Sequence, residues 1–434
     1  MLYRSLNKES ISVNFETALK NGLAKDGGLF YPEKIQKLDK SFLENLHNYS
    51  NIDIAFQVIK QFIGDEINEK DLKEIIKNTI DFDFPLIDIE NNIQTLELFH
   101  GPTLAFKDVG ARFMANCLAY FNKSNSDITT VLVATSGDTG AAVANGFLDV
   151  KGTNVVILYP KNMVSDIQER QLTTNKKNIK AYKVHGTFDD CQQMVKKAFV
   201  DKELNSELNL TSANSINVAR WLPQMFYYFF ALKQIKTTNK KIVFSVPSGN
   251  FGNICAGIIA IDLGLPIHHV IASTNSNNTI PRYLKTKIYN PRKTIKTISN
   301  AMDVSNPSNF IRIEEIFNDF TLLKNNLSSY SFNDSQTISA IKSVFNNSKY
   351  ILDPHGAIGY LGLKKYLNTN LSFFGVFLET AHPIKFSNHI EKALNIKIKI
   401  PNVINKIMSK EKVFTEVYSY KDFKDSLLDK YVDH

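Results

Sequence analysis

A regular alternation of apolar strands and helices, between about residues 95 and 275, constrains the fold more than any other feature of the sequence. Helical periodicity separates the apolar runs typical of strands, which occur at residues 130–134, 154–159, 181–184, 241–246 and 269–272. Parallel strands need a long crossover connection, usually a helix. The alternation therefore predicts βαβ units and a mostly parallel sheet in an α/β protein.

Further elements are expected outside this region. Helical periodicity appears at residues 54–62 and 72–80, and the aromatic-rich segment 217–235 predicts one long helix. The apolar run at 373–378 predicts a late strand, and the Lys-rich residues 400–434 are expected to be helical. The sequence shows no internal repeat and no low-complexity linker.

Charge and composition exclude several classes of protein. Lys and Arg total 51 and Asp and Glu total 43 in 434 residues, which gives a net charge of +8. The basic residues are scattered, without the basic stripe or module of a nucleic-acid binder, so solvated Lys-rich faces are expected and no nucleic-acid partner. A modestly positive chain also suits an anionic substrate.

The cysteines and the absence of apolar segments indicate a compartment. The three cysteines are widely spaced in apolar surroundings, which predicts buried thiols in a reducing compartment and no metal site. No apolar run reaches the roughly eighteen residues of a membrane span, and the first thirty residues lack the apolar core of a signal peptide. We therefore expect a cytoplasmic protein without a membrane partner.

Two loops stand between a strand and a helix, where backbone N–H groups bind anions. The loop 249–253 (GNFGN) has the glycines of a phosphate cradle, although its spacing is equally typical of a structural turn. The loop 136–140 (SGDTG) could hold a carboxylate or phosphate, and its alternative is a capped helix start.

Three further features suggest chemistry. Lys107 lies beside aromatic residues, where a desolvated amine becomes a nucleophile, unless it is an ordinary surface lysine. Asn214, Ser215 and Arg220 form either an anion clamp or a helix cap followed by a surface arginine. Thr380 follows the late strand, where a hydroxyl can contact a ligand. Phosphate-type loops together with a buried lysine suggest a pyridoxal phosphate enzyme.

Several segments together resemble the threonine synthases, in the longer type found in bacteria and fungi. They occur in the order of that family and cover most of the chain: 22–32 (GLAKDGGLFYP), 98–108 (LFHGPTLAFKD), 134–142 (ATSGDTGAA), 246–253 (VPSGNFGN), 300–305 (NAMDVS) and 380–386 (TAHPIKF).

The resemblance implies a tryptophan-synthase-β-like fold, the fold type II of pyridoxal phosphate enzymes. This fold has two open parallel-sheet α/β domains plus an N-terminal segment. Residues 1–80 would form that segment, and 81–330 a cofactor-binding core with a small α/β domain at about 110–215. Residues 331–434 would complete the large domain.

The resemblance also implies the site and its cofactor, pyridoxal 5′-phosphate. Lys107 would be the catalytic residue and carry the internal aldimine, and Thr380 would hydrogen-bond the pyridine nitrogen. The cofactor phosphate would be held by Ser248, Gly249, Asn250, Phe251, Gly252 and Asn253. The substrate would be bound by Thr135, Ser136, Thr139, Asn214, Ser215 and Arg220.

The implied reaction converts O-phospho-L-homoserine and water to L-threonine and phosphate, the last step of threonine biosynthesis. It proceeds by γ-elimination of phosphate and β-addition of water on the external aldimine, in a monomer or homodimer. A threonine or serine dehydratase is the rival within the fold class, but it has no reason to keep a phosphate clamp. A decayed, non-catalytic binding protein is the other rival, and the intact lysine, phosphate loop and Thr380 speak against it.

Two residues depart from similar sequences. Ile384 stands where alanine is common, and Glu379 stands where a small residue is common, just before Thr380. The Glu379 carboxylate either faces solvent or perturbs the cofactor, and the sequence leaves both alternatives open.

Overall fold

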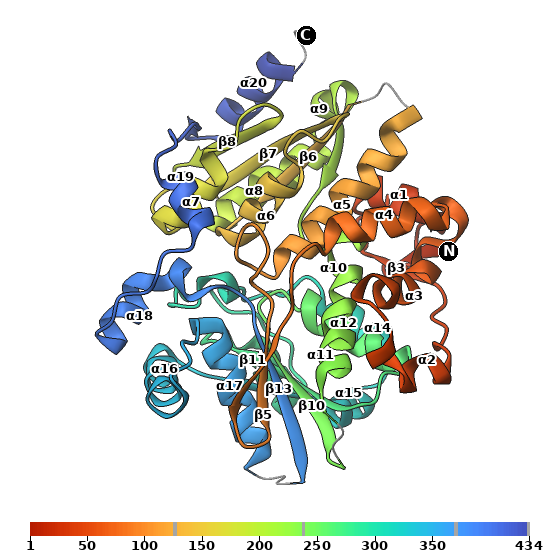
Figure 1. Ribbon diagram of the computed structural model, residues 1–434. Coiled ribbons are helices and arrows are strands. Elements are labelled where there is room, and N and C mark those ends of the chain that lie inside the picture. The colour runs from red at the N-terminus through yellow and green to blue at the C-terminus, as the bar shows by residue number, and fades with distance from the viewer. Residues whose placement is uncertain (125–127, 237–238, 369–371, 432–434) are drawn as a thin grey trace. The chain divides into compact units, whose positions relative to one another are not determined.

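The computed structural model describes residues 1–124, 128–236, 239–368 and 372–431, and the chain divides into two compact units (Figure 1). Unit 1 comprises Met1, Tyr31–Phe106 and Trp221–Lys399. Unit 2 comprises Leu2–Phe30, Lys107–Arg220 and Ile400–His434. Each unit thus gathers separate stretches of the chain. The domain boundaries expected from the sequence stay predictions.

Unit 1 is built on a six-stranded sheet of order β12-β11-β10-β13-β5-β4. Its strands are β4 (Leu86–Glu90), β5 (Ile93–Glu97), β10 (Lys241–Pro247), β11 (Ile267–Thr274), β12 (Leu327–Ser331) and β13 (Phe373–Glu379). Neighbouring strands are parallel except β4 and β5, which are antiparallel. Ser245 of β10 pairs with Phe377 of β13, so the carboxyl ends of these two strands lie side by side.

Helices cover this sheet, with α16 and α17 on one side and α11 and α12 on the other (Figure 1). The helices of unit 1 are α2 (Lys40–Glu44), α3 (Asn51–Ile63), α4 (Glu69–Thr79), α11 (Phe226–Gln234), α12 (Gly252–Asp262), α13 (Thr279–Thr286), α14 (Phe310–Phe317), α15 (Phe320–Asn326), α16 (Asp334–Ser348), α17 (Pro354–Leu367) and α18 (Ser387–Leu394). Its 3₁₀ turns are η1 (Leu46–Asn48), η2 (Gly64–Glu66), η4 (Leu222–Met225), η5 (Asn300–Met302) and η6 (Pro383–Phe386).

Unit 2 contains a five-stranded, wholly parallel sheet of order β14-β8-β7-β6-β9. Its strands are β6 (Thr129–Ala134), β7 (Thr153–Pro160), β8 (Ile179–Val184), β9 (Asn209–Ser212) and β14 (Thr415–Val417). The start of the chain adds a small sheet of order β2-β1-β3, made of β1 (Leu2–Ser5), β2 (Val13–Asn14) and β3 (Phe30–Pro32).

The helices of this part of the chain are α1 (Phe15–Asn21), α5 (Lys107–Phe121), α6 (Asp138–Gly146), α7 (Asp166–Thr173), α8 (Phe188–Val200), α9 (Lys202–Glu207), α10 (Val218–Trp221), α19 (Asn402–Met408) and α20 (Tyr420–Tyr431), with the 3₁₀ turn η3 (Asn122–Ser124). Leu132 and Val156 join one core cluster with Val195 of α8. A Cβ on Gly140 of α6 would instead lie 3.1 Å from Cγ2 of Ile157. Because successive side chains of a strand point to opposite faces, α6 and α8 cover opposite faces of this sheet.

The strands predicted from apolar runs are confirmed as β6, β7, β8, β10, β11 and β13. The prediction of one long helix over 217–235 is wrong: α10, η4 and α11 replace it. Pro223 stands in η4, where its ring and missing N–H exclude a continuous α-helix. Two helices match the earlier segments, α3 at 54–62 and α4 at 72–80.

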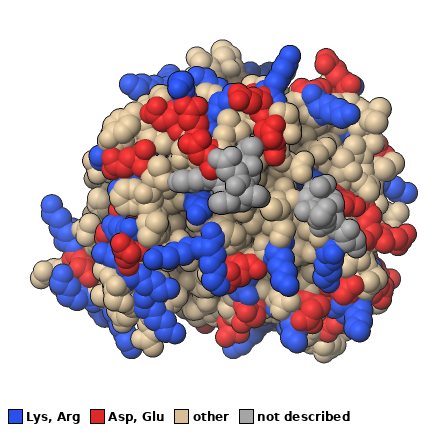
Figure 2. All heavy atoms as spheres, turned by 90° about the horizontal axis from the view of Figure 1, so that it is seen from above, with Lys and Arg blue, Asp and Glu red and all other residues tan. Residues whose placement is uncertain are grey.

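Surface charge of both signs is intermixed on the face that Figure 2 presents, where Lys and Arg side chains lie among Asp and Glu. Within the described residues, no helix is both long enough and apolar enough to cross a membrane. The same residues contain no cluster of three or more His, Cys, Asp or Glu side chains suited to a metal ion.

Candidate active site

The loop 248–253 follows β10 and leads into α12, in unit 1. Ser248 is buried; its N–H donates to the Ser273 carbonyl at 2.9 Å and its hydroxyl to the Val246 carbonyl at 3.0 Å. Phe251 has a φ of 62°, a left-handed conformation, directly before the first residue of α12. The first N–H groups of a helix have no acceptor within it, so this turn presents donors at the helix N-terminus.

Close packing explains the small and amide residues of this loop. A Cβ on Gly249 would lie 2.7 Å from the Cα of Met302, so only glycine fits there. The Asn253 side chain donates back to the Pro247 carbonyl at 2.8 Å, and the Asn253 carbonyl accepts from the Tyr228 hydroxyl at 2.7 Å. The backbone is thus held fixed while the glycines keep its surface open.

Thr380 lies at the same edge of the sheet, just past the carboxyl end of the neighbouring strand β13, and is 5% exposed. Its carbonyl accepts from the Phe106 N–H at 2.9 Å, and Ala105 forms an antiparallel bridge with Ala381. Unit 1 therefore brings together the loop 248–253, Thr380 and the segment that ends one residue before Lys107.

The segment 103–106 is held rigidly in unit 1. Leu104 has a left-handed φ of 59°, and the buried Lys385 amine donates to the Thr103 carbonyl at 2.8 Å. The Tyr227 hydroxyl donates to the Phe106 carbonyl. Lys107 follows as the half-buried first residue of α5, which belongs to unit 2. These contacts hold the backbone of the segment that directly precedes Lys107.

In unit 2 the loop 135–140 connects β6 to α6. The buried Thr135 hydroxyl oxygen accepts from the N–H groups of Gly137 at 2.9 Å and Gly140 at 2.8 Å. It acts as the cap of the loop and has its own proton left to donate. Ser136 and Thr139 are partly exposed, so their hydroxyls are the more accessible ones of this loop.

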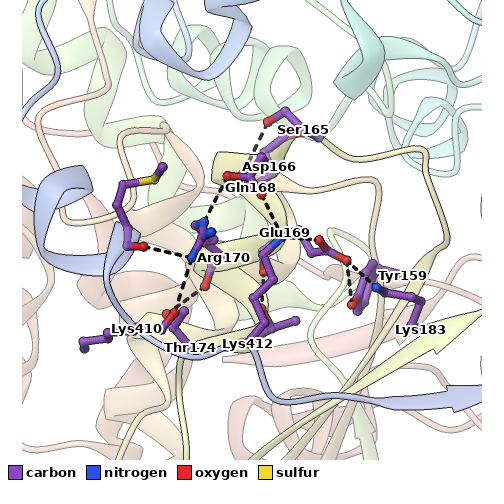
Figure 3. A network of polar contacts seen from close by, with 12 residues as sticks. Tyr159, Ser165, Asp166, Gln168, Glu169, Arg170, Thr174, Lys183, Lys410 and Lys412 are labelled. Atoms are coloured by element: carbon purple, nitrogen blue, oxygen red, sulfur yellow. Dashed lines mark hydrogen bonds and ion pairs between the residues drawn. The ribbon is translucent and has the colours of Figure 1, made fainter.

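A second layer of contacts supports that loop. Ser165 is the N-cap of α7 and forms a capping box with Gln168. The Gln168 side-chain amide also donates to the Asp138 carboxylate at 2.9 Å. The C-terminal segment in turn holds α7: Lys412 binds Glu169 at 2.6 Å, and Arg170 donates to the Met408 carbonyl at 3.0 Å (Figure 3). Polar contacts thus link the C-terminal segment through α7 to the loop 135–140.

The proposed anion clamp lies at the carboxyl edge of the same sheet, because β9 is parallel to β6. The Asn214 amide donates to the Ala134 carbonyl at 2.9 Å, which joins the ends of the two strands. Arg220 is 2% exposed and donates to the Ala213 carbonyl. Ser215 is half-buried, between these two residues in the sequence. Unit 2 therefore brings together Thr135, Ser136, Thr139, Asn214, Ser215 and Arg220 at one edge.

Three buried titratable residues, Glu379, Asp353 and His355, form a cluster beside Thr380 that sequence analysis did not predict. Glu379 is 0% exposed, which excludes the alternative that it faces solvent. It accepts from the Asp353 N–H, and the Asp353 carboxylate contacts His355 Nδ1. Burial, and next the charge of Asp353, raises the pKa of Glu379 well above its ordinary value and favours its protonated form. The sequence signal was the unusual carboxyl before Thr380.

His382, two residues after Thr380, is largely enclosed. Its Nδ1 accepts from the Ile384 N–H at 3.1 Å and caps η6. Burial, followed by the electrostatic influence of His100, lowers the pKa of His382 to about 4. The ring is therefore neutral at physiological pH.

Comparison with known families identifies the class of protein. A family model described as "Pyridoxal-phosphate dependent enzyme" matches residues 94–372, which is more than half of the chain. The fold and the strand-end loops thus belong to a pyridoxal-phosphate-dependent enzyme of fold type II, as the sequence predicted.

Two further models define the family. They are described as "Threonine synthase N terminus" and "Threonine synthase, C-terminal", and match residues 2–80 and 356–425. Threonine synthase from Buchnera aphidicola subsp. Baizongia pistaciae is 47% identical over 92% of this chain and 92% of its own. The chain belongs to the threonine synthase family.

Solved structures agree with this assignment. The crystal structure of threonine synthase from Escherichia coli has 37% identity and a TM-score of 0.94, and covers 99% of this chain and 100% of that one. The structure of PLP-bound threonine synthase from Brucella melitensis has 32% identity and a TM-score of 0.92, with 99% of both chains covered. The predicted family and its cofactor are therefore confirmed, and the roles of individual residues stay predictions.

Proposed function

We propose that this chain converts O-phospho-L-homoserine and water to L-threonine and phosphate. The observation that carries the proposal is the arrangement within unit 1. There, the loop 248–253 and Thr380 end neighbouring parallel strands, and Thr380 pairs with the residue before Lys107. Ligands of open α/β sheets bind at this edge. The family to which the chain belongs supports the same reaction.

Pyridoxal phosphate fits the residues present. The loop 248–253 offers glycine backbone and the N-terminus of α12, which together suit a phosphate dianion. The close approach of Met302 to Gly249 leaves no room for a side chain on that glycine. Thr380 offers a neutral hydroxyl, which suits an unprotonated pyridine nitrogen. When bound, the cofactor supplies the electron sink that stabilises negative charge at the substrate Cα.

Lys107 is proposed to hold the cofactor covalently and then to act as the base. Its neutral amine would then take the proton from the substrate Cα. The contacts of the segment 103–106 hold the backbone immediately before Lys107, and a catalytic group reacts faster when it is held in a productive geometry.

The residues of unit 2 are proposed to bind the substrate. Ser136 and Thr139 donate hydroxyl hydrogen bonds to the carboxylate, with Thr135 holding the loop that carries them. Asn214, Ser215 and Arg220 hold the phosphate, where the guanidinium offers paired donors. A buried arginine binds an anion more strongly than an exposed one, because less water competes for its donors.

The test is an assay of O-phospho-L-homoserine with pyridoxal phosphate supplied. We expect equal amounts of phosphate and L-threonine, and loss of both in Lys107→Ala together with the visible absorption band of the bound cofactor. Formation of α-ketobutyrate from L-threonine or L-serine, without phosphate release from the phosphorylated substrate, would contradict the proposal and favour a dehydratase.

We also propose the cytoplasm as the compartment of this enzyme. Cys117, Cys191 and Cys255 are all buried and free, as suits a reducing environment.

A further inference from the structure

The start of α14 holds the loop 248–253 in place through contacts that all lie within unit 1. The Ser308 N–H donates to the Asn250 side-chain oxygen at 2.6 Å. Asn309 donates twice to the Asn250 carbonyl, from its N–H at 3.3 Å and from its side-chain amide at 3.0 Å. The rings of Phe251 and Phe310 pack edge to face, 5.7 Å apart. Each contact orients the backbone of the phosphate loop.

Behind Asn309 lies a buried positive charge. Arg312 is 0% exposed, and its guanidinium donates to the side-chain oxygen of Asn309. The guanidinium also lies over the ring of Trp221, 4.8 Å from its centroid. Arginine cannot lose its proton in a protein, so this buried group remains a cation. Burying a cation is costly, and a nearby anion offsets the cost.

The hydrogen bonds connect this cation to a donor of the loop. Arg312 polarises the Asn309 amide, which donates to the Asn250 carbonyl. That carbonyl and the Phe251 N–H belong to one peptide group. Hydrogen bonds in such a chain strengthen one another, so the Phe251 N–H becomes a better donor to an anion.

The electrostatic influence of Arg312 also reaches α12. Burial raises the pKa of the Cys255 thiol, in the first turn of α12, to about 12, while the charge of Arg312 acts in the opposite direction. The cation therefore favours negative charge at the end of α12 that carries the phosphate loop.

We propose that Arg312 is a positioning residue for the cofactor phosphate, acting through Asn309 on the backbone of residues 250 and 251. This inference rests on the proposed function, which places the phosphate at the loop 248–253. It adds a charged residue of α14 that does not itself belong to the loop and that acts through Asn309, 59 positions from Asn250.

The test compares pyridoxal phosphate with pyridoxal, which has the same aldehyde and ring but no phosphate. Affinities are measured from the visible absorption of the protein-bound ligand. We expect Arg312→Met to weaken pyridoxal phosphate roughly tenfold or more, and pyridoxal less than about twofold. Arg282→Met is the matched control, since Arg282 lies on α13 of the same unit and binds Asn278 and Asn290. It is expected to change neither affinity.

A second variant keeps the test valid if Arg312→Met does not fold. Asn309→Asp keeps the shape and the contact with Arg312, but removes the side-chain donor to the Asn250 carbonyl and adds negative charge. It is expected to lower the preference for pyridoxal phosphate in the same way. Equal losses for both ligands, or no loss for either, would overturn the inference. A wild-type protein without any preference for pyridoxal phosphate would overturn the assignment of the phosphate loop itself.

Discussion

At the scale of single residues, the Glu379 side chain fills the space that the missing side chain of Gly356 leaves open. A Cβ on Gly356 would lie 1.3 Å from Oε2 of Glu379, so the carboxyl occupies the space that a side chain would need. The large residue before Thr380 is accommodated because the facing position on α17 is glycine. The carboxyl is therefore part of a packed, buried group that includes Asp353.

Gly356→Ala is predicted to lower the free energy of unfolding by about 2 kcal/mol, because the added methyl displaces Glu379. Urea denaturation measures the loss. Gly359→Ala on the same helix is the control and should cost less, since its Cβ would meet Pro247 only at 3.3 Å. Glu379→Ala in the Gly356→Ala background should remove part of the cost; strictly additive effects would contradict the account.

His382 predicts how stability depends on pH. Its pKa is about 4 in the folded chain, against about 6.5 in an unfolded one. A depressed pKa contributes stability that is present above pH 6.5 and is lost as the pH falls towards 4. His382→Asn keeps an acceptor for the Ile384 N–H but cannot titrate.

We expect the variant to lose roughly 2 kcal/mol less stability than the wild type between pH 6.5 and 4, as measured by urea denaturation. Asp303 has the opposite effect. Burial raises its pKa to about 6, so its contribution to the stability of the folded chain is lost as the pH rises to that value. The comparison of variant with wild type cancels Asp303. The exposed His47→Asn is the matched control; an unaltered pH slope in His382→Asn would refute the argument.

At the scale of elements, the C-terminal segment supports α7. Lys412→Met removes ion pairs with Asp166 and Glu169, at 2.7 and 2.6 Å (Figure 3). These side chains are partly exposed, so we expect a modest loss of about 1 kcal/mol. Amide hydrogen exchange in α7 should become faster. Lys421→Met, which breaks the exposed pair with Asp425, should leave α7 unchanged. Equal exchange in the two variants would contradict the coupling.

Local sequence patterns predicted the apolar strands β6, β7, β8, β10, β11 and β13 and several of the loops that follow them, because a strand and its loop depend on neighbouring residues. The more polar or shorter strands β4, β5, β9, β12 and β14 were missed, and β14 lies in the segment 400–434 that was expected to be helical. Pro223 shows where pattern alone misled: the aromatic-rich segment 217–235 contains a residue that interrupts an α-helix. The partners of the site could not be predicted in the same way. Asn309 meets Asn250 across 59 positions, and Asp353 meets Glu379 across 26, so only the folded chain reveals these contacts.

At the scale of the whole molecule, the ligands of the substrate phosphate are proposed to lie in unit 2. Arg220→Ala is predicted to raise KM for O-phospho-L-homoserine roughly a hundredfold, because it removes the paired donors for the phosphate. The visible band of the bound cofactor should persist and would show that Lys107 is still in place. An unchanged KM would reject Arg220 as a phosphate ligand.

In the proposed reaction, phosphate leaves by elimination and water then adds to Cβ. The loss of a Cβ proton and the breaking of the Cγ–O bond release phosphate with all four of its original oxygens. Water supplies the hydroxyl at Cβ, and protons return to Cγ and Cα. Hydrolysis by a phosphatase would break the P–O bond instead and yield homoserine.

The most direct measurement is therefore one turnover assay in water enriched with oxygen-18, followed by mass spectrometry of both products. We expect one heavy oxygen in L-threonine and none in the released phosphate. Heavy oxygen in the phosphate, with homoserine in place of threonine, would contradict it.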